Sequence, residues 1–147
     1  GWDTAFSLQV LDTHGQHEKI DSDFQTVLDS NPLLGTNASL APGSVNLGRQ
    51  SLDTRIDLSN DEWQIRLGYQ NRQIETGAGL FDALDTVGEA NSDRYNADVT
   101  YTNTNFSEHW DFKAQYSFFN TITKSDLVLL PPGTNTGAAV FPNGVIG

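Results

Sequence analysis

The sequence predicts an all-β fold, an antiparallel meander of about five strands with long loops. Three observations support this fold class. Apolar and polar residues alternate in five separate segments, turn-forming residues separate those segments, and helical spacing is confined to short stretches of the loops. The alternating segments run from about Trp2 to Asp12, Ser51 to Leu58, Glu62 to Gln70, Arg94 to Asn103, and His109 to Phe119.

Each segment has one apolar and one polar face. In the third segment the apolar face consists of Trp63, Ile65, Leu67 and Tyr69. The polar faces of the segments carry charges of both signs, and the charged residues that we single out are Arg55, Asp57, Arg66, Asp98, Asp111 and Lys113. Strands of this kind are typical of an antiparallel sheet whose two faces meet different environments.

The connections between the segments alternate in length. Long segments at 13–50, 71–93 and 120–147 alternate with short ones at 59–61 and 104–108. In an antiparallel meander this pattern places all short turns at one end of the sheet and all long loops at the other. Outer-membrane barrels have this asymmetry and strands of about 9 to 11 residues. We therefore expect the sheet to be a segment of a transmembrane β-barrel.

Large aromatic residues gather toward the ends of the segments. We predict that they lie at the two membrane interfaces, with aliphatic residues between them, because two aromatic bands around an aliphatic belt are typical of such barrels. The interface aromatics are Trp2, Trp63, Tyr69, Tyr95, Tyr101, Trp110, Tyr116 and Phe118. The alternative is a soluble β-sandwich, whose inner faces also take large rings.

Composition limits the classes of function. Nineteen Asp and Glu against eight Lys and Arg give a net charge of −11, which repels nucleic acid, so we expect no nucleic-acid partner. The chain has no Cys, and no apolar run approaches the roughly 18 residues of a membrane helix. With Gly1 at the start and no Met anywhere, we expect residues 1–147 to be a single-domain fragment of a longer chain.

The long segments show limited regular structure. Between Ser22 and Ser30, the spacing of Phe24, Val27 and Leu28 predicts a short helix in the first loop, with Ser22 and Gln25 spaced as a capping box.

The other two long segments are harder to assign. Leu80, Phe81 and Leu84 have helical spacing in the second, which predicts a turn or two of helix. In the third, the sequence "LVLLPPG" indicates a short loop strand or a packing segment.

Candidate chemical groups are few. His14 and His17 stand three apart beside Glu18 and Asp21, which would suit a metal ion, although solvated loop residues explain them better. We expect no metal site, no cofactor and no catalytic residue.

The carboxylates of the polar faces allow a second interpretation. Asp53, Asp57, Asp98 and Asp111 could supply the acid pair of a glycosidase. Alternating charges on facing strands more often form a salt-bridged, hydrated wall. We expect the chain not to be an enzyme.

These features together resemble one family of membrane proteins. The stretch "TNASLAPGSVNLGRQSLDTRIDLSNDEWQIRLGYQNRQIETGAGLFDALDTVGEANSDRYNADVTYTN", followed by "NFSEHWDFKAQYSFFN" and "LVLLPPG", is similar to the early barrel strands and loops of TonB-dependent outer-membrane receptors. The similarity covers nearly the whole chain. In such receptors a plug domain fills a barrel of about 22 strands, and the TonB complex energises import of ferric siderophores, haem, cobalamin or glycans.

The resemblance implies a location, partners and roles. The chain would be a wall and loop segment in the outer membrane of a Gram-negative bacterium, in contact with outer-membrane lipid. The six charged residues singled out above would face the lumen and the receptor's own plug domain, and the long loops would help to form the vestibule for a ferric siderophore or similar ligand. No particular ligand-binding residue is assigned. An open wall exposes its edges and its apolar face, so we expect self-association of the isolated fragment.

Overall fold

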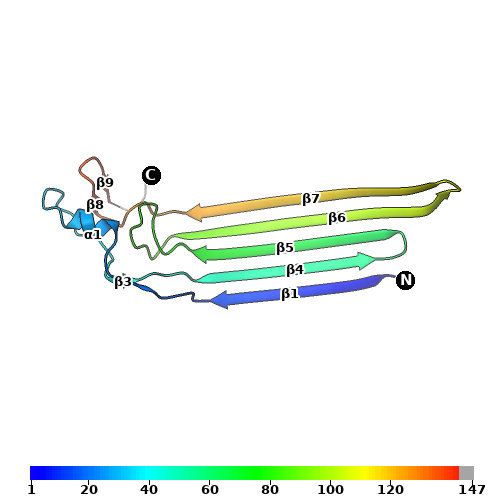
Figure 1. The fold of residues 1–147 in the computed structure, drawn as a ribbon, viewed down its shortest axis with the longest axis horizontal. Helices are drawn as coiled ribbons and strands as arrows, with labels where there is room; N and C mark the ends of the chain where they lie inside the picture. The colour runs from blue at the N-terminus through cyan, green and yellow to red at the C-terminus, as the bar shows by residue number, and fades with distance from the viewer. Residues whose placement is uncertain (143–147) are drawn as a thin grey trace. The chain divides into compact units, whose positions relative to one another are not determined.

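The structure is a computed structural model that describes residues 1–142. Its main feature is a five-stranded antiparallel sheet in the order β1-β4-β5-β6-β7 (Figure 1). The strands are β1 (Asp3–Thr13), β4 (Arg49–Ser59), β5 (Trp63–Glu75), β6 (Glu89–Ser107) and β7 (Trp110–Asp126). The predicted fold class, mostly β with an antiparallel meander of five strands, is confirmed.

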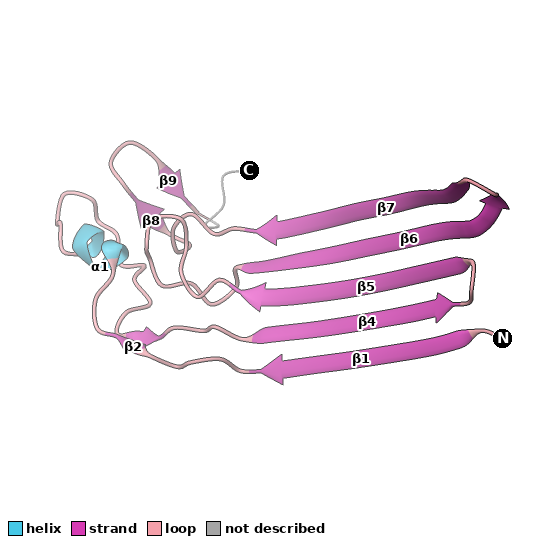
Figure 2. Cartoon of the chain, turned by 45° about the vertical axis from the view of Figure 1, so that its right-hand side comes forward, coloured by secondary structure: helices cyan, strands magenta, loops and turns pink. Residues whose placement is uncertain are grey.

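Smaller elements lie in the long connections, which Figure 2 draws in pink between the magenta strands. The connection from β1 to β4 contains β2 (Lys19–Ile20), α1 (Phe24–Asp29) and β3 (Gly43–Ser44), and β2 pairs with β3. After β7, β8 (Thr134–Asn135) pairs with β9 (Val140–Phe141).

Four strands are longer than the sequence pattern predicts, and one of them is β4, which covers Arg49–Ser59 instead of 51–58. β5 continues to Glu75, β6 covers Glu89–Ser107, and β7 continues to Asp126. Most of the added residues are polar, with Ile74, Phe106 and Ile122 among the exceptions, so side-chain alternation ends before backbone pairing does. The predicted turn at 104–108 was therefore too long, since 104–107 belong to β6 and only Glu108 and His109 form the turn.

The turn between β4 and β5 depends on Asn60. Its backbone N–H donates to the carbonyl of Trp63 at 2.8 Å, and its side-chain Oδ1 accepts from the N–H groups of Glu62 at 2.9 Å and Trp63 at 2.7 Å. Asn commonly makes such side-chain bonds to the backbone in tight turns. This turn, at 60–62, begins one residue later than the predicted turn at 59–61, because Ser59 still belongs to β4.

The chain divides into two compact units. The sheet unit contains 1–11, 51–72 and 92–123, which are most of the five strands. The loop unit contains 12–50, 73–91 and the chain from Lys124 onward. The three long segments therefore pack with one another and do not form separate loops.

The loop unit has a small mixed core. Its buried apolar side chains are Ala83, Leu84 and Leu130, and its buried polar side chains are Gln25, Thr36, Asp85 and Thr134. Leu130 is only 2% exposed, which confirms a packing role for the "LVLLPPG" stretch. Members of this core come from all three long segments.

The predicted helix in the first loop is present, but its predicted cap was wrong. Asp23, not Ser22, is the N-cap residue of α1. Asp23 Oδ1 accepts from the N–H of Thr26 at 2.8 Å, and Thr26 Oγ1 accepts from the N–H of Asp23 at 3.1 Å. Ser22 and Asp23 are both suitable N-cap residues, and the residue that completes the capping box with Asp23 is Thr26 rather than Gln25.

The predicted helix in the second loop is absent, and a tight hairpin takes its place. Ala78 pairs with Leu84, and the N–H of Gly79 donates to the carbonyl of Ala83 at 2.8 Å. Asp82 has a φ of 54°, a left-handed conformation that ends any right-handed helix. Leu80 and Phe81 therefore lie at the tip of a hairpin, not on one face of a helix.

Candidate functional site

The apolar face of the sheet carries rings in contact at two levels. The rings of Trp63 and Tyr101 lie 4.8 Å apart between centroids, and those of Tyr69 and Tyr95 lie 5.0 Å apart. Phe112 extends the first group, at 6.2 Å from Tyr101. Six residues of β5 separate the two levels, or about 20 Å along the strand. The structure thus brings these predicted interface aromatics together in two cross-strand groups.

Other predicted interface aromatics lie on β7 or, in the case of Trp2, directly before β1. Trp2, Trp110 and Tyr116 are 54%, 73% and 70% exposed. Leu67, between the two ring groups on β5, is 43% exposed. An exposed apolar surface of this extent is typical of a face that contacts another molecule or a membrane.

The second ring group marks the end of the apolar belt. The Tyr69 hydroxyl donates to Asp93 Oδ1 at 2.8 Å, and Asn71 Nδ2 donates to the same oxygen at 2.9 Å. Beyond this level the same parity of β5 is polar, with Gln73 and Glu75. At a boundary between apolar and aqueous surroundings, a tyrosine keeps its ring on the apolar side and its hydroxyl on the aqueous side.

The opposite face of the sheet holds the charged residues singled out from the sequence. Arg55, Asp57, Arg66 and Asp98 line one hollow of about 430 Å³, together with Asn96. Asp111 and Lys113 lie on β7 and are not part of its lining.

Neutral donors approach two carboxylates of this face. Gln70 Nε2 donates to Asp53, and the Ser117 hydroxyl donates to Asp98 Oδ1 at 2.6 Å. These bonds tie neighbouring strands together across the polar face. Asp53 and Asp98 therefore act as acceptors in cross-strand hydrogen bonds.

A cation–π contact on the polar face was not predicted. The Arg94 guanidinium lies 5.7 Å from the centroid of the Phe119 ring. Phe119 has the parity of Lys113 and Ser117, so it is an aromatic residue on the charged side of β7. Its place in the double "FF" of the sequence was the available signal, because only one of two adjacent strand residues can face the apolar side.

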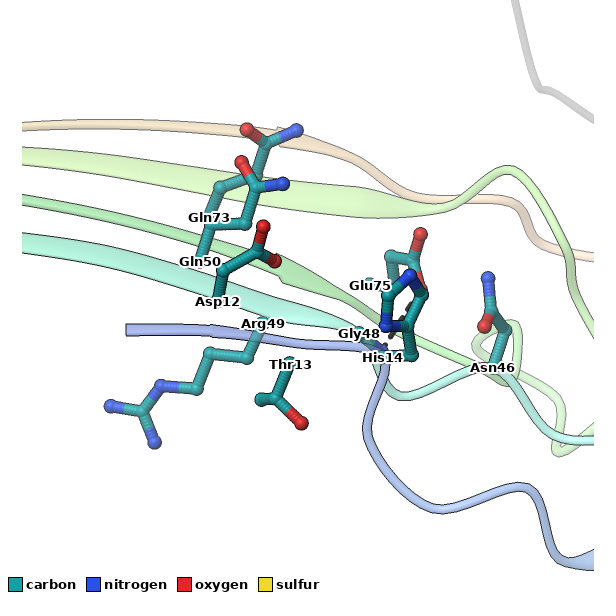
Figure 3. Close-up of a pocket in the computed structure, with 9 residues that line it drawn as sticks. All are labelled: Asp12, Thr13, His14, Asn46, Gly48, Arg49, Gln50, Gln73 and Glu75. Carbon is teal, nitrogen blue, oxygen red and sulfur yellow. Dashed lines mark hydrogen bonds between the residues drawn. The ribbon is translucent and has the colours of Figure 1, made fainter. Parts of the chain in front are cut away.

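The loop unit contains a polar hollow of about 250 Å³, shown in Figure 3. Glu75 Oε2 accepts from the N–H of Gly48 at 2.9 Å at its wall. Arg49 points its guanidinium away from Asp12, Gln50 and Gln73 in this view. The hollow is smaller than the 300 to 1,000 Å³ typical of ligand pockets, so we assign it no ligand.

The metal hypothesis gains no support from the described part of the chain. Of the four residues considered, only His14 lines the polar hollow. Asp21 pairs with Lys19 at 3.7 Å. Within residues 1–142, no three His, Asp or Glu side chains are placed to hold a metal ion together.

Two aspartates organise the loop unit. Asp23 caps α1 through Oδ1, and its Oδ2 accepts from the N–H of Leu84 at 2.7 Å. Asp29 accepts from the N–H groups of Ala38 at 2.9 Å and Ser39 at 2.7 Å. Burial by itself would raise the pKa of both carboxyls, but these hydrogen bonds outweigh burial and hold each pKa below its usual value.

Gln25 connects the first and third long segments. It is fully buried, and its Nε2 donates to Asp29 Oδ1 at 2.7 Å and Thr36 Oγ1 at 3.3 Å. Its Oε1 accepts from the Thr134 hydroxyl at 2.7 Å. The sequence analysis assigned Gln25 to a capping box, and no sequence signal connects it with a residue 109 positions away.

Fold and site together define a class of chain: an open antiparallel sheet with one aromatic-rich apolar face and one charged face, joined to a folded loop unit. No protein-family model, curated protein or solved structure matches this chain. Among the described residues, no helix has the length and apolar character needed to cross a membrane.

Proposed function

We propose that this chain is a wall and extracellular-loop segment of an outer-membrane TonB-dependent receptor, which imports a ferric siderophore or a similar scarce nutrient. The observation that carries the proposal is the apolar face of the sheet. It presents two ring groups, at Trp63–Tyr101 and Tyr69–Tyr95, with exposed aliphatic residues between them. An aliphatic belt between two aromatic bands is typical of a sheet face that contacts lipid.

The remaining parts have roles in the same proposal. The face with Arg55, Arg66 and Asp98 lines the lumen of a transmembrane β-barrel and contacts the plug domain through polar groups. The loop unit contributes to the outer vestibule for the ligand. TonB supplies energy to the parent receptor, and this chain supplies no catalysis.

The extended strand ends support the same placement. β6 and β7 have 19 and 17 residues, more than the 9 to 11 that cross the hydrocarbon region. Their added residues, such as 89–93 and 120–126, are mainly polar and suit strands that continue into water. Against a soluble sandwich, Leu67 and Phe112 are 43% and 44% exposed, whereas a second layer would bury them.

The test is the behaviour of residues 1–147 in detergent and lipid. We expect light scattering to show a defined species only in detergent, or oligomers without it. In vesicles of lipids brominated at different acyl positions, the fluorescence of Trp63 is expected to be quenched most by bromines near the headgroup, with Trp2 and Trp110 changed to Phe. A monodisperse monomer in detergent-free buffer, with no quenching by any brominated lipid, would refute the proposal and promote a soluble β-sandwich.

A further inference from the structure

The helix α1 is oriented with Gln25 inward and with Phe24 and Val27 outward. Gln25 is fully buried, while Phe24 and Val27 are 43% and 64% exposed. The buried amide makes three hydrogen bonds, because it donates to Asp29 and Thr36 and accepts from Thr134. Exposed apolar side chains on a folded loop indicate a contact surface when they are grouped.

These side chains are grouped with the tip of the second-loop hairpin. The rings of Phe24 and Phe81 are stacked, with centroids 6.2 Å apart and planes at 26°. Phe81 and its neighbour Leu80 are 50% and 60% exposed. We name Phe24, Val27, Leu80 and Phe81 the apolar patch.

The patch is held in place before anything binds. Asp23 joins its two halves, since it caps α1 and accepts from the N–H of Leu84 at the base of the hairpin. The N–H of Leu80 donates to the carbonyl of Val128 at 3.0 Å, which fixes the hairpin to the third long segment. All three long segments therefore position the two rings, and a preorganised surface loses little conformational freedom on binding.

The loop unit that carries the patch has a strongly negative net charge. The loop unit contains ten Asp and Glu against three Lys and Arg, and one of those cations, Lys19, is paired with Asp21. Asp82 directly follows Phe81 and is exposed. Negative potential beside aromatic faces favours a cation that also has apolar surface.

We infer that the apolar patch binds a small organic cation with an apolar body, through ring contact with Phe24 and Phe81 and attraction to Asp82. The inference rests on the proposed function in one respect, because it names the chemical class of ligand that the loop unit of such a receptor would meet. An anionic ligand, a membrane surface of anionic lipid and a second copy of this acidic chain are all disfavoured by the same charge.

The test compares two probes that differ in one group. Phenethylammonium and 2-phenylethanol share an aromatic body, but only the first is charged. Each is titrated into the full chain in non-ionic detergent, and methyl and aromatic NMR shifts of Phe24, Val27, Leu80 and Phe81 are followed. We expect saturable shifts confined to the patch, with several-fold tighter binding of the ammonium compound.

Matched variants locate the two contributions. Phe81→Leu keeps an apolar side chain but removes the ring, and it should weaken ammonium binding about two- to fivefold. Asp82→Asn removes the charge while Asn tolerates the left-handed backbone, and it should weaken binding up to about fivefold. Phe106→Leu is the control, because Phe106 is 65% exposed but lies in the sheet unit.

Equal affinity for the two probes, or shifts that Phe81→Leu and Phe106→Leu alter alike, would overturn the inference. Quenching of the same chain in brominated-lipid vesicles reports on the proposed membrane placement separately. Loss of probe binding with quenching intact refutes only the cation site, whereas loss of quenching refutes the receptor proposal.

Discussion

Gln25 illustrates how a single polar residue holds distant segments of the chain together. A buried amide without partners would be costly, but the donors and acceptors of Gln25 meet groups from residues 29, 36 and 134. The network links the first long segment to the third. Loss of Gln25 would therefore leave its partners without these hydrogen bonds.

Changing Gln25 to Ala should therefore destabilise the loop unit by about 1 to 3 kcal/mol, because the Thr134 hydroxyl and Asp29 lose a buried partner. Hydrogen exchange of the amides of 24–39 and 128–136 measures the effect. Gln16→Ala serves as the control, since Gln16 is exposed. Equal exchange in the two variants would show that the network contributes nothing to stability.

Asp23 and Asp29 make the loop unit sensitive to acid. Their folded-state pKa values are held below the ordinary value of 3.8 by donors that include Leu84 and Ser39. A lowered folded pKa gives stability that is present above the unfolded pKa and is lost as the pH falls through the folded pKa. We expect protection of the Leu84 and Ser39 amides to be constant from pH 7 to about 5 and to fall below about pH 4.

The measurement is hydrogen-exchange protection, corrected for intrinsic rates, at several pH values. Asp23→Asn should remove the acid dependence at Leu84 while leaving it at Ser39, because only Asp29 accepts from the Ser39 N–H. Protection that stays constant down to pH 3 in the unchanged chain would contradict the assignment.

At the scale of single elements, the alternating pattern was sufficient to place the strands but not to end them. Within 62–70 each side chain has a clear face, and β5 begins at Trp63, one residue after the predicted start at Glu62. Its last five residues, 71–75, are polar on both faces except Ile74, so the side chains give no signal and backbone pairing alone continues the strand. The same holds for 120–126 of β7.

The loops were predictable only where local chemistry decides their structure. α1 follows from the spacing of Phe24, Val27 and Leu28, but this spacing does not reveal that Gln25 rather than Phe24 is buried. That orientation depends on Thr134, far along the chain. The hairpin at 78–84 was misassigned because two glycines and the left-handed Asp82 outweigh the spacing of three apolar residues.

The connection between β1 and β4 requires a close backbone approach at Gly15. Gly15 has a φ of +71°, and a Cβ there would lie 2.0 Å from the Leu47 carbonyl oxygen. Gly35 has a similar φ of +58° but no atom within 4 Å of such a Cβ. Gly15→Ala should therefore cost about 1 to 3 kcal/mol more than Gly35→Ala, because both variants suffer backbone strain and only the first suffers a clash.

Thermal unfolding of the two Ala variants in the same detergent tests this difference. The pair cancels the left-handed strain that is common to both positions. Equal transition temperatures would mean that the chain near Leu47 moves aside at little cost.

The face of β5 gives a further prediction at the element scale. Leu67 lies between the two ring groups, so Leu67→Arg would place a charge near the middle of the face that we propose contacts lipid. It should reduce the stability of the membrane-inserted chain by about 2 to 4 kcal/mol. Gln64→Arg adds the same charge on the opposite, polar face and should cost much less.

Unfolding by denaturant in lipid vesicles compares Leu67→Arg with Gln64→Arg. If the two variants lose equal stability, the two faces of β5 do not meet different solvents. A large loss of stability in Gln64→Arg alone would mean that the face with Gln64 contacts lipid and the face with Leu67 contacts the lumen.

For the whole sheet, the odd number of strands has a geometric consequence. Five antiparallel strands alternate in direction, so β1 and β7 at the two edges run the same way, as the arrows in Figure 1 show. Pairing β7 of one copy with β1 of the next would therefore be parallel if the copies had the same orientation. Outer-membrane barrels of single bacterial chains are antiparallel and have an even number of strands. Copies of this sheet alone are thus poorly suited to close such a barrel.

Self-association of the isolated chain should accordingly join like edges about a two-fold axis, β7 with β7 or β1 with β1, because this pairing is antiparallel. The chain has no Cys, so introduced cysteines report on single positions. When Ser7→Cys and Ser117→Cys chains are mixed and oxidised, we expect cross-links between identical variants and few between different ones. Light scattering should show dimers rather than larger rings. Predominant mixed cross-links would mean that parallel edge pairing is accepted. The expected result instead means that each edge of the sheet accepts only antiparallel pairing.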